Sequence, residues 1–331
     1  MSLPPKEIPL GAIRFNSDSQ KLEYWMGSAW MQILTFTPSL DGGSRGLFGG
    51  GQSPAVVNNV DYVTIPTTGN ATDFGNLIAA KGAAGTCASN TRGFMGGGGG
   101  GGNVNTIQFW EFSSTGDAVD FGDLTSSRHW TQPASNQTRG VWAGGHPGVN
   151  IIEFVTMTHA GNAVNFGDMS YVTAVGANSA NNSPTRGFFG GGTPTYTNVI
   201  EFINFGSTGN SQDFGDSSTK VAREARGSSA TRGLLIGGVR PEPSASTIVD
   251  FFTMSSLGNA TSFGDAGSSI SNSSGCSDCV RVAFAHGNNP STTDTIEYIN
   301  ISTGGDAVDF GNLSQSRDHM GGCSNGHGGL G

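Results

Sequence analysis

Lysine is the scarcest charged residue in this chain of 331 residues, which has only Lys6, Lys21, Lys81 and Lys220. Charged residues of both signs make up 12% of the sequence, about half of the usual quarter. The formal net charge is −9, and the arginines do not cluster. Because no basic patch is present to neutralise a phosphate backbone, the composition excludes nucleic acid as the expected partner.

Long apolar runs are also missing. No stretch approaches the roughly 20 apolar residues that a membrane helix needs. The first residues, Met1 to Lys6, lack the apolar core of a signal peptide. We therefore expect neither membrane insertion nor a secretory leader.

Residues typical of metal centres are few. The chain has four cysteines and six histidines. Cys276 and Cys279 form a single CxxC with no second pair to complete a zinc site, and the histidines show no metal-ligand spacing. Cys87 and Cys276 each lie five residues before a repeated arginine and are predicted to be small buried core residues; the sequence predicts no metal and no cofactor.

Glycine is the residue in excess, with 54 copies, or roughly one residue in six against a usual 7%. Glycine costs roughly 1 kcal/mol at each interior helical position, so helices are disfavoured. Yet 35% of the residues are apolar and 20 are Phe, too many for a disordered low-complexity chain. The composition predicts an all-β protein rich in turns.

An internal repeat organises the sequence. An Arg-Gly motif, with two apolar residues and then glycines, recurs at intervals of 47, 47, 47, 46 and 49 residues. Its copies begin at Arg45, Arg92, Arg139, Arg186, Arg232 and Arg281. The sixth copy has Val282 in place of the first glycine.

Two further motifs follow each arginine. One places a polar residue between an apolar and an aromatic residue, and its polar residues are Asp61, Gln108, Glu153, Glu201, Asp250 and Glu297. The other is Phe-Gly-Asp/Asn, at Phe74, Phe121, Phe166, Phe214, Phe263 and Phe310. A Gly-Asn or Gly-Asp pair, a hairpin-turn signal, precedes each copy of the latter.

Each motif reads as a strand, and a segment such as Ser127 to Ala134 supplies a fourth. Four strands in about 47 residues are typical of one blade of a β-propeller. Because the tail after Leu313 matches the segment that precedes Arg92, we expect a C-terminal strand to complete the first blade. This gives six blades. The alternatives are seven blades, with Gly326 to Gly331 opening the extra one, and a solenoid.

The unit resembles a divergent kelch, or galactose-oxidase-type, propeller repeat over residues 41–331. The resemblance rests on an arginine-bearing strand (Arg128, Arg317), an apolar strand that ends in a glycine pair, and an aromatic strand. Phe-Gly-Asp stands where kelch repeats usually place a tryptophan. The resemblance implies a closed ring of blades.

The repeated charged residues have a structural interpretation. A buried arginine needs a partner, so we expect each repeated arginine to bond the Asp, Glu or Gln of a neighbouring strand, or nearby carbonyls. The alternative is a ring of arginines that binds anions in the channel.

The segments after the glycine clusters differ most between copies. They are Gln52 to Asn58, Gly98 to Asn103, His146 to Val149, Thr193 to Thr197, Val239 to Ser246 and Gly287 to Thr293. All join the same pair of strands, so we expect them on one rim, where recognition loops usually lie. The candidate binding residues there are His146, Tyr196, Arg240, Glu242 and Asn288. The alternative is a set of unconstrained turns.

Catalytic signals are weak. The run Gly96 to Gly102 is followed by a predicted strand, and a phosphate-binding loop would require a helix there. Acidic residues recur with the repeat, so they mark no paired-carboxylate site. We expect no enzymatic activity.

Residues 1–40 contain less glycine than the repeats and several aromatic residues close together. Their pattern predicts a small meander of strands. Such a meander cannot bury a core alone. Its Gly-x-Ile-Arg-Phe-Asn, Lys-Leu-Glu-Tyr-Trp and Gly-Ser-x-Trp pattern resembles N-terminal modules of tailed-bacteriophage virion proteins, especially fibre and appendage proteins. The resemblance implies a module that anchors or oligomerises a virion component, with Phe15, Tyr24, Trp25 and Trp30 as its contact residues.

Together these features predict a non-enzymatic structural protein of a phage particle, such as a tail, neck or capsid-associated fibre component. It would be assembled in the host cytoplasm, present in several copies, and bound to other virion proteins through residues 1–40. The propeller would contact proteins or a host-surface glycan or receptor. The alternative is a lectin or carbohydrate-active enzyme on a secreted propeller.

Overall fold

The computed structural model describes residues 8–16, 21–32, 44–52, 54–194, 196–240, 244–289 and 291–330. The chain divides into two compact units, residues 1–42 and 43–331. The boundary expected after residue 40 lies outside the described residues. In the described part both units are built of β-strands, and the one helical element is the 3₁₀ turn η1 (Gly328–Leu330).

The N-terminal unit is a three-stranded antiparallel sheet. Its strands are β1 (Ile13–Asn16), β2 (Lys21–Trp25) and β3 (Trp30–Gln32), in that order. On one face Arg14 pairs with Glu23 at 2.8 Å and stacks over Trp30. The other face is apolar and exposed, and it carries Ile13, Phe15, Leu22, Tyr24 and Met31. The turn expected at residues 17–20 lies outside the described residues.

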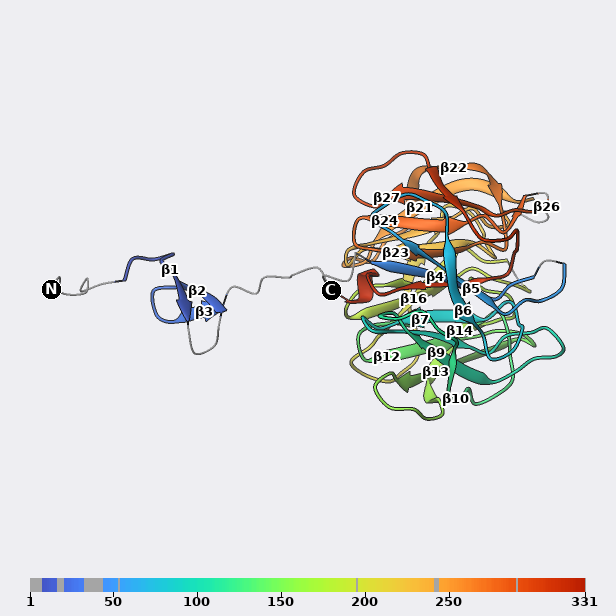
Figure 1. Cartoon of the computed structure of the whole chain (residues 1–331), viewed down its shortest axis with the longest axis horizontal. Coiled ribbons are helices and arrows are strands. Elements are labelled where there is room, and N and C mark those ends of the chain that lie inside the picture. Colours follow the sequence, from blue (N-terminus) through green and yellow to red (C-terminus); the bar gives the residue numbers. More distant parts are fainter. Residues whose placement is uncertain are drawn as a thin grey trace. The chain divides into compact units, whose positions relative to one another are not determined.

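The larger unit repeats a four-stranded antiparallel sheet (Figure 1). Within each sheet the Arg-Gly, apolar-polar-aromatic and Phe-Gly motifs form three successive neighbouring strands. The first sheets contain β4 (Arg45–Gly49), β5 (Asn59–Thr64) and β6 (Thr72–Asn76); β7 (Gly85–Ala88), β8 (Arg92–Gly96), β9 (Thr106–Glu111) and β10 (Val119–Asp123); and β11 (Gln132–Ser135), β12 (Arg139–Ala143), β13 (Val149–Thr156) and β14 (Val164–Thr173).

The remaining sheets follow the same order along the chain. They contain β15 (Asn181–Asn182), β16 (Arg186–Gly190), β17 (Val199–Asn204) and β18 (Gln212–Asp216); β19 (Ala225–Ser228), β20 (Arg232–Ile236), β21 (Ser246–Thr253) and β22 (Thr261–Ile270); and β23 (Ser274–Ser277), β24 (Arg281–Ala285), β27 (Thr295–Asn300) and β28 (Val308–Asn312). A short ribbon, β25 (Asn288–Asn289) with β26 (Ser291–Thr292), interrupts the last of these. The C-terminal strand β29 (Gly321–Ser324) pairs with β4 and completes the first sheet, as the sequence predicts.

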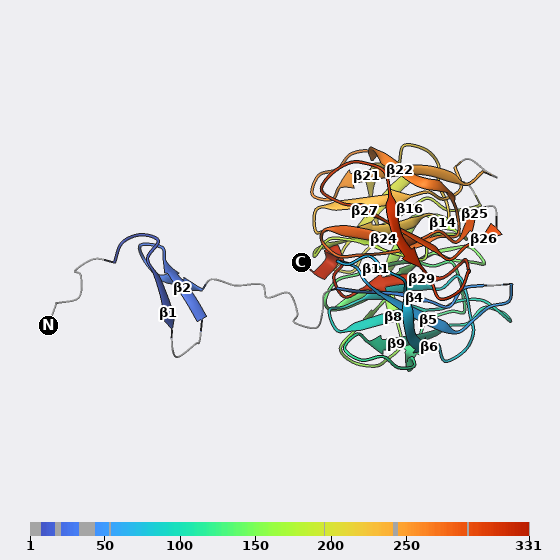
Figure 2. The same cartoon turned by 45° about the horizontal axis from the view of Figure 1, so that its top comes forward.

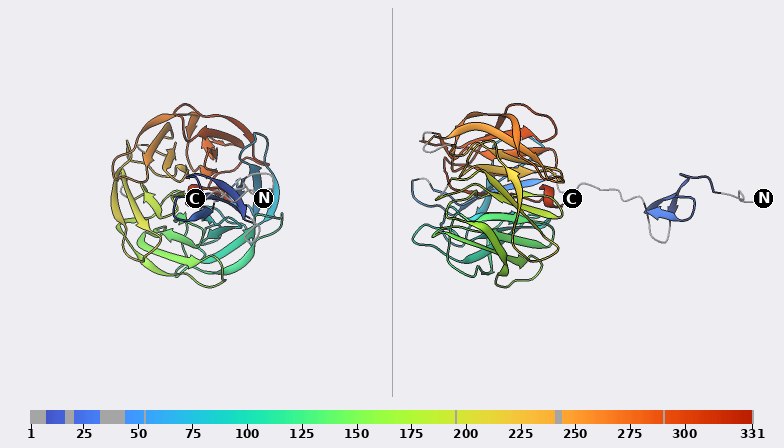
Figure 3. Two further views of the ribbon diagram at one scale, coloured as in Figure 1. Left: turned by 90° about the vertical axis from the view of Figure 1, so that its left-hand side faces the viewer. Right: turned by 180° about the vertical axis from the view of Figure 1, so that it is seen from behind.

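The sheets of this unit surround a common centre (Figure 3, left). Their innermost strands contact one another in the cyclic order β29, β7, β11, β15, β19, β23 and back to β29. Apolar clusters fill the spaces between successive sheets, for example where Leu47 and Val60 of the first sheet meet Met95 and Trp110 of the next. This all-β architecture is consistent with a β-propeller.

The innermost strands are shorter than the sequence suggests. The segment Ser127 to Ala134 is predicted as a strand, but the strand β11 begins only at Gln132. Trp130 has a φ of 60°, a left-handed conformation that ends an extended strand. Arg128 and Arg317 therefore precede the strands that the kelch-like pattern assigns to them.

A two-part latch joins each sheet to the next. The amide of each Gly in the Gly-Asn/Asp pairs donates to the carbonyl of a Phe in the Phe-Gly motif of the neighbouring sheet. The six bonds, at 2.7–3.0 Å, are Gly116 to Phe74, Gly161 to Phe121, Gly209 to Phe166, Gly258 to Phe214, Gly305 to Phe263 and Gly69 to Phe310. The following Asn or Asp then accepts from a second amide in the neighbouring strand, as Asn259 does from Asp216 at 3.0 Å.

The latch explains why the Phe-Gly motif contains glycine. A Cβ built on Gly215 would lie 2.4 Å from the carbonyl oxygen of Gly258, and the φ of Gly215 is +147°. Because the obstacle is backbone that the latch itself holds, it cannot move aside without opening the contact between the sheets.

We predict that Gly215→Ala destabilises the larger unit by about 2 kcal/mol or more, through strain and the lost latch. Gly206→Ala is the matched control, because its Cβ would meet nothing within 4 Å. Chemical denaturation of both variants measures the difference. Equal stability of the two variants would contradict the account.

Each of the six repeated arginines binds a carbonyl, and Arg92 also pairs with Glu111 of the neighbouring strand at 2.7 Å, so both kinds of expected partner occur. Each guanidinium also lies over the aromatic residue of its own sheet, as Arg186 does over Phe202 at 4.6 Å, a favourable cation–π arrangement. The carbonyl acceptors belong to the adjacent sheet: Phe112 for Arg45, Met157 for Arg92, Phe205 for Arg139, Met254 for Arg186, Ile301 for Arg232 and Pro66 for Arg281. These bonds repeat around the whole unit and support the structural interpretation.

The acidic residues of the repeat have other partners. Buried ion pairs join Arg317 to Asp61, Arg128 to Glu153, Arg240 to Asp250 and His286 to Glu297. Glu201 accepts bonds from the Ser170 amide and the Ser211 hydroxyl.

The C-terminal segment closes one end of the space inside the ring. The turn η1 contacts β15 and β19, and Leu330 is buried. The His327 Nε2–H donates to the Ala88 carbonyl at 2.8 Å, and its Nδ1 accepts from the Gly329 amide at 3.1 Å. This segment, which the seven-blade alternative assigns to an extra blade, thus packs against the innermost strands.

His327 should make stability depend on pH. Burial lowers the pKa of His327 to about 4, below its usual 6.5, so the unfolded chain binds more protons between these values. The stabilisation is complete above pH 6.5 and is lost as the pH falls toward 4, by up to about 3 kcal/mol.

We predict that His327→Gln loses less stability than the wild type between pH 7 and pH 4.5, since glutamine does not titrate. Urea denaturation at several pH values checks this. Parallel losses in the two proteins would refute the assignment.

Candidate functional site: the channel mouth

The variable loops meet on one side of the larger unit. In every sheet a loop residue forms a β-bridge with a residue that precedes an innermost strand. The bridges are Gln52 with Asp318, Gly82 with Gly99, His129 with His146, Val175 with Thr193, Ala222 with Val239 and Ser271 with Gly287. The ribbon β25–β26 marks this side, and the C-terminus lies on the opposite side (Figures 1 and 2). The predicted common rim is therefore present.

A ring of residues, five of the six in left-handed conformation, lies next to these bridges, and we call it the channel mouth. Its members, each at the corresponding position of its sheet, are Ala83, Trp130, Gly176, Arg223, Asn272 and His319. Backbone hydrogen bonds link Ala83 to His319, Trp130 to Ala83, Gly176 to Trp130 and His319 to Asn272. The φ values of the members other than Gly176 are 52–64°. Such values are uncommon outside glycine and concentrate at functional sites.

The large side chains of the mouth come from alternate positions. The Arg223 guanidinium lies 4.8 Å from the centroid of the Trp130 ring. The His319 ring lies 5.2 Å from the same indole. Because these residues are two positions apart around the ring, their side chains reach across it and meet over the space it surrounds.

A cavity of about 380 Å³ opens beside Trp130 and His319. Its wall includes Gln52 and Asn103, the ring of His129, and the backbone of residues 99–102. No carboxylate is among its described lining residues. A ligand there meets flat rings, amides and backbone groups, which suit an uncharged polar molecule with a ring-shaped apolar face.

The histidines of the mouth are held close together. The His129 ring lies 4.8 Å from that of His146, and His129 Nδ1 lies 2.8 Å from Asn103 Oδ1. Burial, and then the neighbouring His146 and His319, lower the pKa of His129 to about 4. His129 is therefore neutral at pH 7. Its Nδ1–H donates to the amide oxygen, and Nε2 is left as an acceptor.

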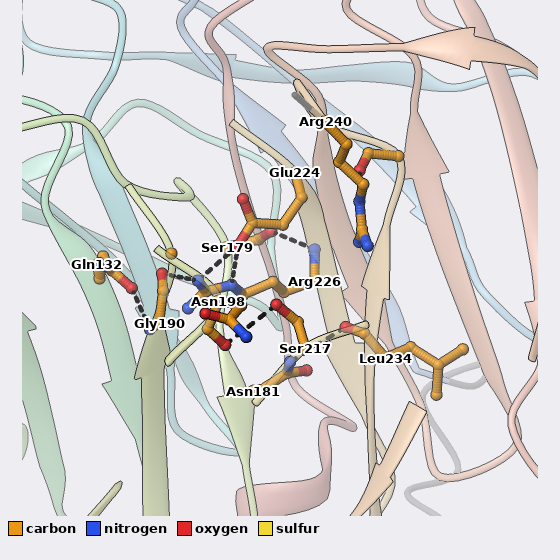
Figure 4. A network of polar contacts seen from close by, with 12 residues as sticks. Gln132, Ser179, Asn181, Gly190, Asn198, Ser217, Glu224, Arg226, Leu234 and Arg240 are labelled. Atoms are coloured by element: carbon orange, nitrogen blue, oxygen red, sulfur yellow. Dashed lines mark hydrogen bonds and ion pairs between the residues drawn. The ribbon is translucent and has the colours of Figure 1, made fainter. Parts of the chain in front are cut away.

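A buried polar network supports the mouth beside Arg223 (Figure 4). The next residue, Glu224, accepts from Arg226 at 2.6 Å, and Arg226 also donates to the Gly190 carbonyl at 2.7 Å. The Arg226 amide in turn donates to Ser179 at 2.9 Å. The Arg226 guanidinium therefore pairs with Glu224 Oε1 inside the protein, next to Arg223 in the chain.

The predicted binding residues fall in different places. His146 forms a β-bridge with His129 beside the mouth, and Tyr196 and Asn288 are partly exposed. Arg240 is 6% exposed and donates to Asp250 at 2.5 Å and to the Gly237 carbonyl at 2.8 Å, so its contacts are internal. Glu242 lies outside the described residues.

Sequence reasoning missed Trp130, Arg223 and His319. Each stands just before an innermost strand, at a position where other copies have Ala, Gly or Asn. An alignment of the repeats would therefore have shown large side chains where other copies have small ones. The left-handed backbone at these positions has no clear sequence signature.

Among the described residues no cluster of three or more His, Cys, Asp or Glu could hold a metal ion. None of the helices in the described ranges has the length and apolar character needed to cross a membrane. No family model matches the chain, and neither does any curated protein.

Proposed function

We propose that this chain is a non-enzymatic structural protein of a tailed-phage particle, built as a six-bladed, kelch-like β-propeller that presents a binding mouth. The cyclic contacts of the innermost strands and the six latches support six blades. The N-terminal unit anchors the protein to other virion proteins, and the channel mouth contacts the host surface.

One observation carries the binding role. Five of the six mouth residues share a left-handed backbone, yet their side chains range from Ala83 to Trp130, beside a cavity of about 380 Å³. Residues that stabilise the fold occur at the same position in every sheet. A site that binds one ligand must instead differ between the sheets. The cavity wall offers rings and amides, and its described residues include no Asp, Glu, Lys or Arg, which favours a neutral glycan over a charged receptor.

We predict that Trp130→Ala and His319→Ala each weaken binding of the full chain to host-surface glycans at least tenfold, because each removes a ring that a sugar would contact. Leu257→Ala is the control, since Leu257 is exposed in the turn after β21. A glycan array followed by titration measures the effect. Unchanged binding by both mouth variants would exclude this site.

A reducing-sugar assay on the glycans that bind separates the proposal from its alternative. The proposal expects no release of sugar. Turnover of any polysaccharide would favour the carbohydrate-active enzyme.

The N-terminal unit offers a surface that suits anchoring. Phe15 is 64% exposed and Ile13 66%, and they share one sheet face with Leu22, Tyr24 and Met31. Three short strands bury too little surface to be stable alone, so a partner that covers this face stabilises the unit. Trp25 and Trp30 lie on the other face, with ring centroids 5.4 Å apart, and contribute to the unit itself.

We predict that removal of residues 1–36 leaves a folded propeller that no longer joins particles. Phe15→Asp, which places a charge in the apolar face, should act in the same way, whereas the control Ala29→Asp should not. Quantitative mass spectrometry of purified particles gives the copy number. Normal incorporation of the deletion variant would refute anchoring by this unit.

A further inference from the structure

Two sheets contain a buried ion pair at a position where the sheet of β7–β10 has a cation without a carboxylate. In the first sheet Arg317 donates to the Asn59 carbonyl and pairs with Asp61 at 3.0 Å. In the sheet of β7–β10, Lys81 donates to the Thr106 carbonyl at 3.5 Å, the equivalent bond. The residue that corresponds to Asp61 is Gln108, which is neutral.

The correspondence extends to the surrounding contacts. Gln108 Oε1 accepts from the Ile78 amide at 3.0 Å, as Glu153 accepts from the Thr125 amide at 2.8 Å. Gln108 thus occupies the same position, with the same kind of amide donor, as the Glu153 carboxylate. Within the described residues, none of the ion pairs includes Lys81, although its side chain is only 6% exposed.

An uncompensated buried amine is costly. Burial lowers the pKa of Lys81 to about 8, so most of the amine is still charged at pH 7. What the amine lacks is an anion.

A second cavity, of about 340 Å³, lies beside this amine. Lys81, its acceptor Thr106 and Gln108 all line it. Apolar groups of Ile78, Ala79, Ala80 and Val104 form much of the rest. The cavity therefore combines one cation with an apolar wall.

The glycine run, which the repeat does not require, forms the remaining wall. Residues 99–103 line both this cavity and the one at the mouth. A Cβ on Gly101 would meet nothing within 4 Å. Gly101 lines both cavities, so a large side chain at this position has space to extend there.

We propose that the cavity beside Lys81 binds a small organic acid, whose carboxylate pairs with the Lys81 ammonium and whose apolar body lies against Ile78 and Val104. The ligand supplies the negative charge that Asp61 and Glu153 supply in their own sheets. This site is separate from the mouth and does not depend on the virion role.

The test uses the full chain with acetate, butyrate and benzoate, and with benzamide as the uncharged counterpart of benzoate. Isothermal titration at pH 7 should show that butyrate or benzoate binds at least tenfold more tightly than benzamide. Failure of all three acids to bind, or equal binding of benzamide, would overturn the proposal.

Three variants locate the site. Lys81→Met removes the cation, and Gln108→Glu restores the internal pair of the other sheets, so each should weaken benzoate or butyrate binding at least tenfold. Gly101→Phe should block the cavity, whereas Gly206→Phe, also in open space, should not. Thermal unfolding identifies any variant that fails to fold. Wild-type binding by a folded Gln108→Glu variant would exclude this pairing.

Discussion

The latch between neighbouring sheets is the contact on which the rest of this structure depends. A glycine amide reaches the carbonyl of a Phe in the next sheet, as Gly258 reaches Phe214 at 2.9 Å. Because the two backbones come so close, there is no room for a side chain on Gly215, the residue that follows the acceptor Phe214. Each sheet has one exposed outer edge, and the latch covers it with the adjacent turn. The last latch, Gly69 to Phe310, joins the two ends of the repeat array.

Residues that make none of these repeated contacts can differ between the sheets without loss of the fold. The repeated arginines and glycines bind backbone of neighbouring sheets, and most of the repeated acids pair with buried side chains, so their roles are structural. Five of the six mouth residues have a left-handed backbone but different side chains, and Lys81 faces a neutral Gln108 where the sheets of Asp61 and Glu153 have an ion pair. Departures from the repeat, more than the repeat itself, therefore point to binding sites.

The sequence predicted the strand motifs, the pairing of β29 with β4 and the common rim, because these follow from period, alternation and turn residues. It predicted Arg128 within a strand, and this was wrong, since Trp130 adopts a left-handed conformation that ends the strand. The sequence did not decide whether the repeated arginines bind acidic side chains or carbonyls, because spacing alone does not show which neighbour a long side chain reaches. Trp130, Arg223 and His319 were missed because their proximity arises only when the ring closes.

The central claim is that the six latches close one cooperative ring. Native-state hydrogen exchange of the six latch amides, from Gly69 to Gly305, tests it most directly. The account predicts that all six exchange with the same free energy, equal to that of global unfolding, because opening any one sheet breaks the ring. Distinct values, with Gly69 at the seam between the chain ends exchanging well before the others, would contradict it.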